Sequence, residues 1–314
     1  MTISQNIIIG SSPISLVKAI LMGRSNKEIL IIDKGKSIGG CWQISQHSGM
    51  NFDLGCHFLV PFEADEDNIK LISTFKNLGI SAELTNPKAY FGRKIDEITD
   101  YSRDYKYIKV DGGYPNIIKT LHDCVLDLGI PILKDNILSI SVDNEVSLIG
   151  ERKNYKTENL FIPSYCDLRK IEVHGKNIDL ECPYQDSQHL VVLAKGLWNK
   201  KHYDYYFLNE SDKFTFDKLT VHEGHEKHLF NIRVGKKHKL KSDEELIKLA
   251  SDFIKELGYE IKKIIYSERH IYEFPYRSEL YVRNFQKNLD HESGGKIKMF
   301  YTRNFTKALL EANV

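Results

Sequence analysis

Two short runs of apolar residues, separated by a helical pattern, open the chain and constrain its fold more than any other feature. The runs Asn6–Ile9 and Glu28–Asp33 are rich in isoleucine and do not alternate polar with apolar positions, which is typical of strands buried on both faces of a parallel sheet. Between them, Leu16, Ala19 and Ile20 recur at the spacing of one helix face. Strand, helix and strand in this order predict a βαβ unit and an α/β domain.

The turn between the first strand and the helix, Gly10–Ser15, is the first candidate for a binding site. In a parallel unit, the helix N-terminus at this turn offers unpaired N–H groups to an anion. Asp33 closes the second strand about twenty residues after Gly10, where a dinucleotide site has the acid that binds a ribose. The G-x-G-x-x-G fingerprint is incomplete, because Ser12 and Ser15 stand at its second and third glycines. The turn alone therefore predicts either a dinucleotide site or a plain strand–helix turn.

The composition of the 314 residues excludes several other classes of protein. With 44 Lys+Arg against 43 Asp+Glu, the chain lacks the basic excess that drives nucleic-acid binding. No apolar stretch approaches the roughly 20 residues that span a bilayer, and the first residues lack the basic region of an export signal. The five cysteines form no C-x-x-C pair, which favours reduced thiols and a cytoplasmic location.

The segment after Asp33-Lys34 makes the pattern more specific. Gly39-Gly40-Cys41-Trp42 follows it, and Gly49–His57 then reads G-x-x-x-D-x-G-x-H. This order resembles the FAD-binding amine oxidase clan, which includes monoamine and polyamine oxidases, protoporphyrinogen oxidase, phytoene desaturase and UDP-galactopyranose mutase. In that clan the Gly-Gly pair passes beside the flavin phosphates and ribityl chain, where a Cβ has no room. Taken singly, Gly39-Gly40 could be a loop turn and His57 a hydrogen-bonded core histidine.

Later segments extend the resemblance over nearly the whole chain. Gly112-Gly113 precedes a helical pattern that Gly129 ends, and two short strands follow; the resemblance implies that Ile137 contacts the adenine through its backbone. The ending Gly294–Phe305 resembles that of the mutases, with Asn304-Phe305 in place of Asp-Met, where a helix N-terminus meets the flavin pyrophosphate and ribityl side. Phe274–Tyr276 resembles the clan's crossing back toward the flavin.

The predicted fold class is α/β, with a Rossmann-type FAD/NAD(P)-binding domain and an inserted β-rich (α+β) substrate domain. We assign residues 1–75, 109–150 and 265–314 to the FAD-binding domain, and residues 76–108 and 151–264 to the substrate domain. Ser242, followed by three acidic residues, predicts the start of a helix that runs to Leu257 within the substrate domain.

The resemblance implies FAD as the cofactor and a set of residues around it. The implied cofactor contacts are Gly10, Ser11, Ser12, Ser15, Asp33, Lys34, Gly39, Gly40, Cys41, Trp42, His57, Ile137, Asn304 and Phe305. Arg277 and Arg283 are candidate contacts for an anionic substrate. No residue is assigned a catalytic role.

Three functions follow from this set. The first is a flavoenzyme that transfers a hydride from a small-molecule substrate to FAD. The second is a mutase-like flavoprotein that isomerises a nucleotide sugar without net redox change. The third is a Rossmann-like protein that has lost FAD, because Ser12 and Ser15 crowd the two positions that admit the pyrophosphate.

Three other clusters of polar residues are weaker candidates. His222, His225 and His228 do not have the spacing of an H-E-x-x-H metal site, and no metal is expected. Arg233–Lys241 is expected to be a solvated basic loop, with a site for a phosphate-bearing substrate or partner as the alternative. Asp186–His189 lacks the nucleophile elbow of a hydrolase.

Overall fold

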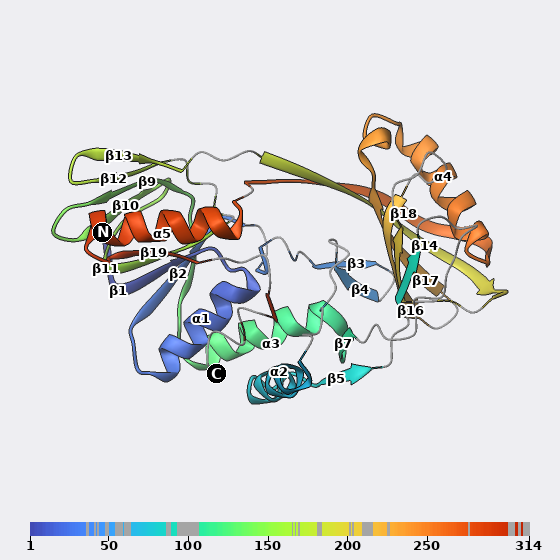
Figure 1. Cartoon of the computed structure of the whole chain (residues 1–314), viewed down its shortest axis with the longest axis horizontal. Helices are drawn as coiled ribbons and strands as arrows, with labels where there is room; N and C mark the ends of the chain where they lie inside the picture. The colour runs from blue at the N-terminus through green and yellow to red at the C-terminus, as the bar shows by residue number, and fades with distance from the viewer. Residues whose placement is uncertain are drawn as a thin grey trace.

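The structure is a computed structural model of the 314-residue chain. Its described residues are 1–35, 38–40, 42, 44–47, 50–53, 59, 64–85, 89–92, 107–164, 166, 168, 170–180, 184–200, 202, 204–208, 216–224, 227–275, 277–300, 305–306 and 309. They form two lobes, each built around one sheet (Figure 1).

The first lobe is built on a nine-stranded sheet in the order β13-β12-β9-β10-β11-β1-β2-β8, with β19 also paired to β11. Its strands are β1 (Thr2–Ile9), β2 (Ile29–Asp33), β8 (Ile132–Lys134), β9 (Ile137–Val142), β10 (Val146–Gly150), β11 (Asn154–Pro163), β12 (Lys170–Val173), β13 (Lys176–Asp179) and β19 (Ile297–Phe300). The pairs β1–β2, β2–β8, β1–β11 and β11–β19 are parallel. The predicted βαβ unit is therefore part of this sheet, with β1 between β11 and β2 and with β2 next to the edge strand β8.

Helices cover both faces of the nine-stranded sheet. α1 (Pro13–Arg24), α2 (Asp65–Asn77) and α3 (Gly113–Asp127) share one hydrophobic core with Ile8 and Ile31. α5 (Glu279–Ser293) packs on the opposite face, where Ile7 and Leu30 point. Successive residues of a strand point to opposite faces, so each isoleucine run is buried from both sides, as a doubly wound sheet requires.

The second lobe is built on a six-stranded sheet in the order β18-β14-β17-β16-β15-β6. Its strands are β6 (Ala89–Gly92), β14 (Tyr184–Trp198), β15 (Tyr205–Leu208), β16 (Phe216–Gly224), β17 (Lys227–Val234) and β18 (Tyr259–Pro275). β14 and β18 pair along their full length and run between the two lobes (Figure 1). Two small antiparallel pairs complete the chain: β3 (Ile44–His47) with β4 (Met50–Asp53), and β5 (Ala82–Thr85) with β7 (Tyr107–Val110).

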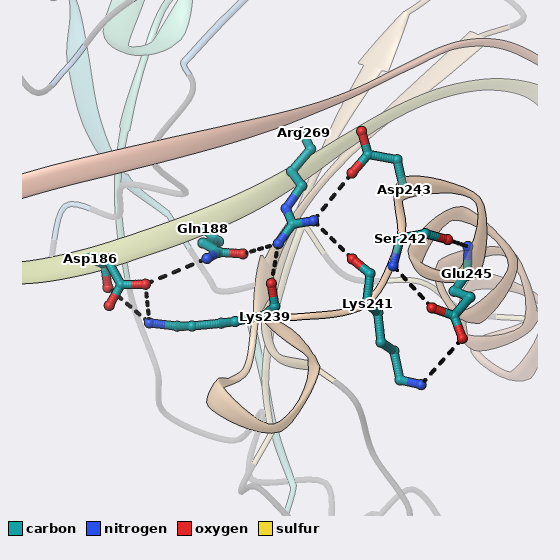
Figure 2. A network of polar contacts seen from close by, with 8 residues as sticks. All are labelled: Asp186, Gln188, Lys239, Lys241, Ser242, Asp243, Glu245 and Arg269. Carbon is teal, nitrogen blue, oxygen red and sulfur yellow. Dashed lines mark hydrogen bonds and ion pairs between the residues drawn. The ribbon is translucent and has the colours of Figure 1, made fainter.

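α4 (Asp243–Glu256) covers one face of the six-stranded sheet and begins as the sequence predicts. The Ser242 hydroxyl accepts a hydrogen bond from the Glu245 amide, and the Glu245 carboxylate accepts one from the Ser242 amide, which completes a capping box. The Arg269 guanidinium donates to the Lys241 carbonyl at 3.0 Å and to Asp243 Oδ1 at 3.2 Å, and so ties the start of α4 to β18 (Figure 2).

The same network fixes the last part of the basic stretch that leads into α4. Lys239 forms an ion pair of 2.5 Å with Asp186 on β14, and its carbonyl accepts a hydrogen bond from Arg269 (Figure 2). The Nζ atom of Lys241 lies 3.8 Å from Oε1 of Glu245, as in an ion pair. The expected loop is present as the short 3-10 helix η3 (Lys236–His238) and its flanking turns, but it is attached to the sheet by these contacts.

The predicted fold class is confirmed: a Rossmann-like lobe with parallel strands is joined to a second lobe with an antiparallel sheet. The sheets divide the chain elsewhere than expected. The substrate domain was expected to start at residue 151, but β11, β12 and β13 belong to the nine-stranded sheet. It was expected to end at residue 264, but β18 continues in the six-stranded sheet to Pro275. Apolar strand patterns show that a strand is buried, but they do not show which sheet it joins.

The helix before β8 also agrees with its prediction. α3 ends at Asp127, and Gly129 two residues later has φ +68, the left-handed conformation that glycine favours just after a helix. The pattern of residues 306–312 predicts a terminal helix; of these, Thr306 and Leu309 are described, and both are helical, as is Phe305 before them. Among the described residues, no helix is long and apolar enough to cross a bilayer.

Candidate nucleotide site

The turn between β1 and α1 places the helix N-terminus at the end of the parallel strands. Pro13 occupies the first helical position, where its missing N–H costs little. Ser12 is the N-cap, and its hydroxyl accepts a hydrogen bond of 3.2 Å from the Ser15 amide. The Ser12 and Ser15 hydroxyls lie 2.9 Å apart, and Ser15 is fully buried. A serine at the third glycine position is therefore accommodated by a bond within the first turn of the helix.

Asp33 closes β2 beside this turn and is bound to it. Its Oδ2 accepts a hydrogen bond of 2.6 Å from the Ser11 amide, and its Oδ1 accepts one of 2.5 Å from the Gly35 amide. Asp33 is buried, while the neighbouring Lys34 is exposed. Each carboxylate oxygen has two lone pairs, so both oxygens of Asp33 keep capacity for another donor.

The Gly39-Gly40 pair lies against the same turn. The Gly39 amide donates to the Ser11 carbonyl at 3.1 Å, and the two glycines have φ +113 and +59. A Cβ on Gly40 would lie 3.4 Å from Cα of Ser12. Both the conformation and the close approach suit glycine here, and the structure thus brings together the two glycine-containing segments that the sequence singled out.

Trp42 and Phe305 meet although they come from opposite ends of the chain. Their ring centroids lie 4.8 Å apart, and the Trp42 ring also meets Tyr114 of α3 at 4.7 Å, both in edge-to-face arrangements. Phe305 is buried, and its ring centroid lies 6.1 Å from that of Phe75 on α2. Both rings thus contribute to the core shared by α1, α2 and α3.

A buried carboxylate that sequence reasoning missed joins β8 and β9 to this site. The Asp135 amide donates to the Asp33 carbonyl at 3.1 Å. The Asp135 carboxylate accepts hydrogen bonds from the Tyr155 hydroxyl at 2.7 Å and from the amides of Asn136, Arg152 and Lys153. It thereby fixes the turn that leads into Ile137, which is partly buried at the start of β9. In the sequence, Asp135 and Asn136 stand between two short strands, and an acid in such a short turn could have indicated a side chain that binds backbone amides.

Burial and hydrogen bonding have opposite effects on this carboxylate. Burial would raise the pKa of Asp135, but its four hydrogen bonds outweigh that effect and hold the pKa below the ordinary value. Burial, together with the adjacent Asp135 carboxylate, raises the pKa of Tyr155 to about 12. Asp135 is therefore ionised and Tyr155 protonated at neutral pH.

Lys18 brings a positive charge to α1 one turn after Ser15. Its ammonium lies 4.7 Å from the ring centroid of Phe161 and 5.8 Å from that of Phe300, as in cation–π contacts. Burial lowers the pKa of Lys18, and the nearby positive charges of Lys298 and Lys27 lower it further. Sequence reasoning did not select Lys18 because it reads as an ordinary polar position of an amphipathic helix.

Arg277 does not fit the expected contact with an anionic substrate. It is 2% exposed, and its terminal nitrogens donate to four backbone carbonyls, those of Ser164, Cys166, Leu168 and Leu180, at 2.7–3.0 Å. The guanidinium thus ties the segment after β18 to the segments that follow β11 and precede β14. Arg283 is exposed on α5, whose apolar side packs on the nine-stranded sheet.

Three expected cofactor contacts, Cys41, His57 and Asn304, lie outside the described residues. Of the histidines considered for a metal, His225 is also outside them, while His222 and His228 lie on the paired strands β16 and β17. Within the described residues, no group of three His, Cys, Asp or Glu side chains is placed to hold a metal ion.

The residues at the start of α1 fit the diphosphate of a dinucleotide. Within the described part of the chain, the amides of Ser12 and Ile14 have no hydrogen-bond partner. They lie in the first turn, where the helix dipole favours negative charge. Ser12 is partly exposed at this position. This donor set is that of an anion site at a helix N-terminus.

Comparison with known proteins agrees with this geometry. Residues 8–75 match the model of the NAD(P)-binding Rossmann-like domain. Cyclohexylamine oxidase from Brevibacterium oxydans IH-35A superposes with a TM-score of 0.69 at 11% identity, covering 98% of this chain and 96% of that one. A reduced UDP-galactopyranose mutase gives 0.69 at 11% identity, over 98% and 90% of the two chains. Putrescine oxidase bound to putrescine gives 0.61 at 10%, over 99% and 97%. No curated protein sequence matches the chain.

The first lobe has the parallel sheet and strand–helix turn of a Rossmann-like domain, in agreement with the match over residues 8–75. The resemblance noted in the sequence is confirmed at the level of the fold: the chain has the two-lobed fold of the FAD-binding amine oxidase clan.

Proposed function

We propose that the protein is an FAD-dependent oxidoreductase that acts on a small-molecule substrate by hydride transfer to the flavin. The observation that carries this proposal is the donor set at the start of α1, next to Asp33, within the fold of the amine oxidase clan. Similarity to solved structures near 10% identity supports the fold, and the chemistry is inferred from the site.

Each part of the site has a role in this proposal. The amides of Ser12 and Ile14 and the positive end of α1 hold the diphosphate. Asp33 accepts hydrogen bonds from the ribose through its remaining lone pairs. The Gly39-Gly40 segment closes over the turn. When bound, FAD supplies two-electron redox chemistry, and the protein binds it, orients it and shields it from water.

The absorption spectrum of the purified chain tests the proposal. We expect a yellow protein with about one flavin per chain, or a colourless one that takes up added FAD. Ser12→Asp provides the matched variant, because it keeps an N-cap acceptor but places a negative charge at the diphosphate position. We expect this variant to fold and to bind FAD much more weakly. A wild-type chain that stays colourless in excess FAD would contradict the proposal and favour the protein that has lost its cofactor.

A mutase-like activity on a nucleotide sugar is the second candidate. It is supported by the fold match, since the mutase superposes with the same TM-score, 0.69, as cyclohexylamine oxidase. Reduction with dithionite separates the two functions. Activity that needs prior reduction and consumes no electron acceptor supports the mutase, whereas one acceptor consumed per turnover supports the oxidoreductase.

A cytoplasmic location forms part of the proposal. Both described cysteines, Cys124 and Cys166, are free thiols, as is usual in a reducing compartment. Cell fractionation of the tagged protein tests the location, and recovery with a membrane or secreted fraction would contradict it.

A further inference from the structure

The serine pair Ser12 and Ser15 belongs to this chain rather than to the dinucleotide fingerprint, which has glycine at both positions. Ser12 has φ −59 and ψ 156, a conformation that a residue with a side chain adopts without strain. Gly40 provides the space beside it, because a Cβ on Gly40 would lie 3.4 Å from both Cα and Cβ of Ser12. The turn therefore has room for the Ser12 side chain.

Burial decides which of the two hydroxyls donates in the 2.9 Å contact between them. Ser15 is fully buried, and among the described residues Oγ of Ser12 is the only hydrogen-bond partner of its hydroxyl. Two other helix serines, Ser251 and Ser293, instead donate to the carbonyl four residues earlier, at 2.7 and 2.6 Å. Because a buried donor without an acceptor is costly, Ser15 donates and Ser12 accepts.

This direction occupies both lone pairs of the Ser12 hydroxyl. One accepts from the Ser15 hydroxyl at 2.9 Å and the other from the Ser15 amide at 3.2 Å. A serine hydroxyl has two lone pairs and one hydrogen, so the Ser12 hydroxyl has only its hydrogen left. That hydrogen points away from α1, since both bonds that Ser12 accepts come from the helix, and Ser12 is partly exposed. The Ser12 hydroxyl is thus a fixed donor at the start of α1.

We infer that the Ser12 hydroxyl donates a hydrogen bond to a phosphate oxygen of the bound dinucleotide, and that Ser15 is the positioning residue that fixes its direction. Hydrogen bonds to a charged acceptor are stronger than neutral ones, and a donor that is oriented before binding loses little entropy. This contact replaces the close backbone approach that glycine gives at the second fingerprint position. The inference rests on the proposed function, because it concerns the same diphosphate site.

A donor at position 12 and a side chain that only crowds the site predict opposite effects of substitution. If the Ser12 side chain crowds the diphosphate, Ser12→Gly removes the obstacle and a diphosphate binds more tightly. If the hydroxyl donates to a phosphate oxygen, Ser12→Gly removes the donor and a diphosphate binds more weakly. Glycine is tolerated at an N-cap, so this variant keeps the helix start while it removes the hydroxyl.

Calorimetric titration of the full chain with ADP and with adenosine tests this inference. ADP carries the diphosphate without the flavin, and adenosine carries no phosphate. We expect Ser12→Ala and Ser12→Gly each to weaken ADP binding by about tenfold or more and to leave the affinity for adenosine unchanged. A purely structural role of Ser12, as the N-cap of α1, would instead lower both affinities alike.

Ser242→Ala is the matched control, because the Ser242 hydroxyl caps α4 by accepting from the Glu245 amide at 3.2 Å, as Ser12 accepts from the Ser15 amide. Its ADP affinity should equal that of the wild type. Ser15→Ala should weaken ADP binding less than Ser12→Ala does, and should have no further effect in the Ser12→Ala background, since Ser15 acts through Ser12. Unchanged or tighter ADP binding in Ser12→Gly, equal losses for ADP and adenosine, or additive effects of Ser12→Ala and Ser15→Ala would overturn the inference.

Flavin binding is measured separately on the same samples by absorbance. A chain that binds ADP through Ser12 but takes up no FAD would reject the proposed function and keep the role of the Ser12 hydroxyl. A chain that binds FAD with an affinity that Ser12→Gly leaves unchanged would do the reverse. A wild-type chain that binds neither ADP nor FAD would reject both.

Discussion

The backbone amide of Ser11 donates a 2.6 Å hydrogen bond to Oδ2 of Asp33, and this bond joins the end of β2 to the turn before α1. The other carboxylate oxygen accepts from the Gly35 amide, so a single buried side chain shapes both loops of the candidate nucleotide site. A ligand held at the α1 N-terminus would therefore depend on Asp33 twice, through direct contact and through the shape of the turn.

Asp33→Asn should weaken both the fold and the site. An asparagine offers one oxygen and one NH₂ group, so one of the two amides, of Ser11 or Gly35, would face a donor. We expect the free energy of unfolding to fall by about 1–3 kcal/mol, measured by urea denaturation without cofactor, and FAD affinity to fall with it. Glu158→Gln, at an exposed position of β11, is the control and should change stability by less than about 0.5 kcal/mol. An unchanged urea midpoint in Asp33→Asn would show that the hydrogen bonds from the Ser11 and Gly35 amides to Asp33 do not contribute to stability.

Tyr155→Phe should reduce stability and its dependence on acid. The folded-state pKa of Asp135 is lowered, so the stabilisation from its ionised form is present above the unfolded pKa, near 3.9, and is lost as pH falls through the folded value. Removing the Tyr155 hydroxyl removes one of the four hydrogen bonds and moves that pKa back up. We expect the free energy of unfolding of Tyr155→Phe to be lower by about 1–2 kcal/mol at pH 7. It should also decrease less steeply than that of the wild type between about pH 5 and 2. Urea denaturation at each pH measures both effects. Parallel curves for the two proteins would refute the coupling.

The same pair predicts an alkaline effect of opposite sign. Because the pKa of Tyr155 is raised to about 12, its stabilising effect is complete below the unfolded pKa, near 10, and is lost as pH rises through about 12. Burial also raises the pKa of Tyr259 to about 12. Ultraviolet titration near the tyrosinate band should therefore show at least two fewer tyrosines ionising near pH 10 than in the unfolded chain, and Tyr155→Phe should remove one of these late-titrating groups.

Arg277→Lys should be strongly destabilising although it keeps the charge. A lysine ammonium has three donors on a flexible stem and cannot reproduce the planar fork that reaches four carbonyls. We expect the free energy of unfolding to fall by about 2–4 kcal/mol, because buried carbonyl acceptors lose their partners. A lower Tm measures this loss. Arg283→Lys on the exposed side of α5 is the control, with a change below about 0.5 kcal/mol. Equal Tm values for the two variants would show that the hydrogen bonds from Arg277 to the four carbonyls contribute little to stability.

Ser242→Ala should cost about 1 kcal/mol of the free energy of unfolding, because the Glu245 amide loses the Ser242 hydroxyl as its acceptor, while the bond from the Ser242 amide to the Glu245 carboxylate can remain. Ser242→Gly should cost less, since glycine is tolerated at an N-cap. Thermal unfolding followed by circular dichroism compares them, and a larger loss for glycine than for alanine would argue against the cap as the cause.

Patterns that are local in sequence determined much of this protein. The isoleucine runs of β1 and β2, the helical spacing in α1 and the Ser242–Glu245 cap each depend on contacts within a few residues, so they can be read without a fold. The nucleotide turn was found in the same way, because Gly10, Ser12 and Asp33 lie within one βαβ unit.

Only the tertiary structure decided which distant residues meet. The structure places β11–β13 in the first sheet. It buries Arg277 against four backbone carbonyls rather than exposing it to a substrate, and it buries Asp135 as the acceptor of four hydrogen bonds. The physical reason is common to these cases. Hydrogen-bond partners and strand register are set by long-range packing, whereas hydrophobic periodicity records only that a residue is buried.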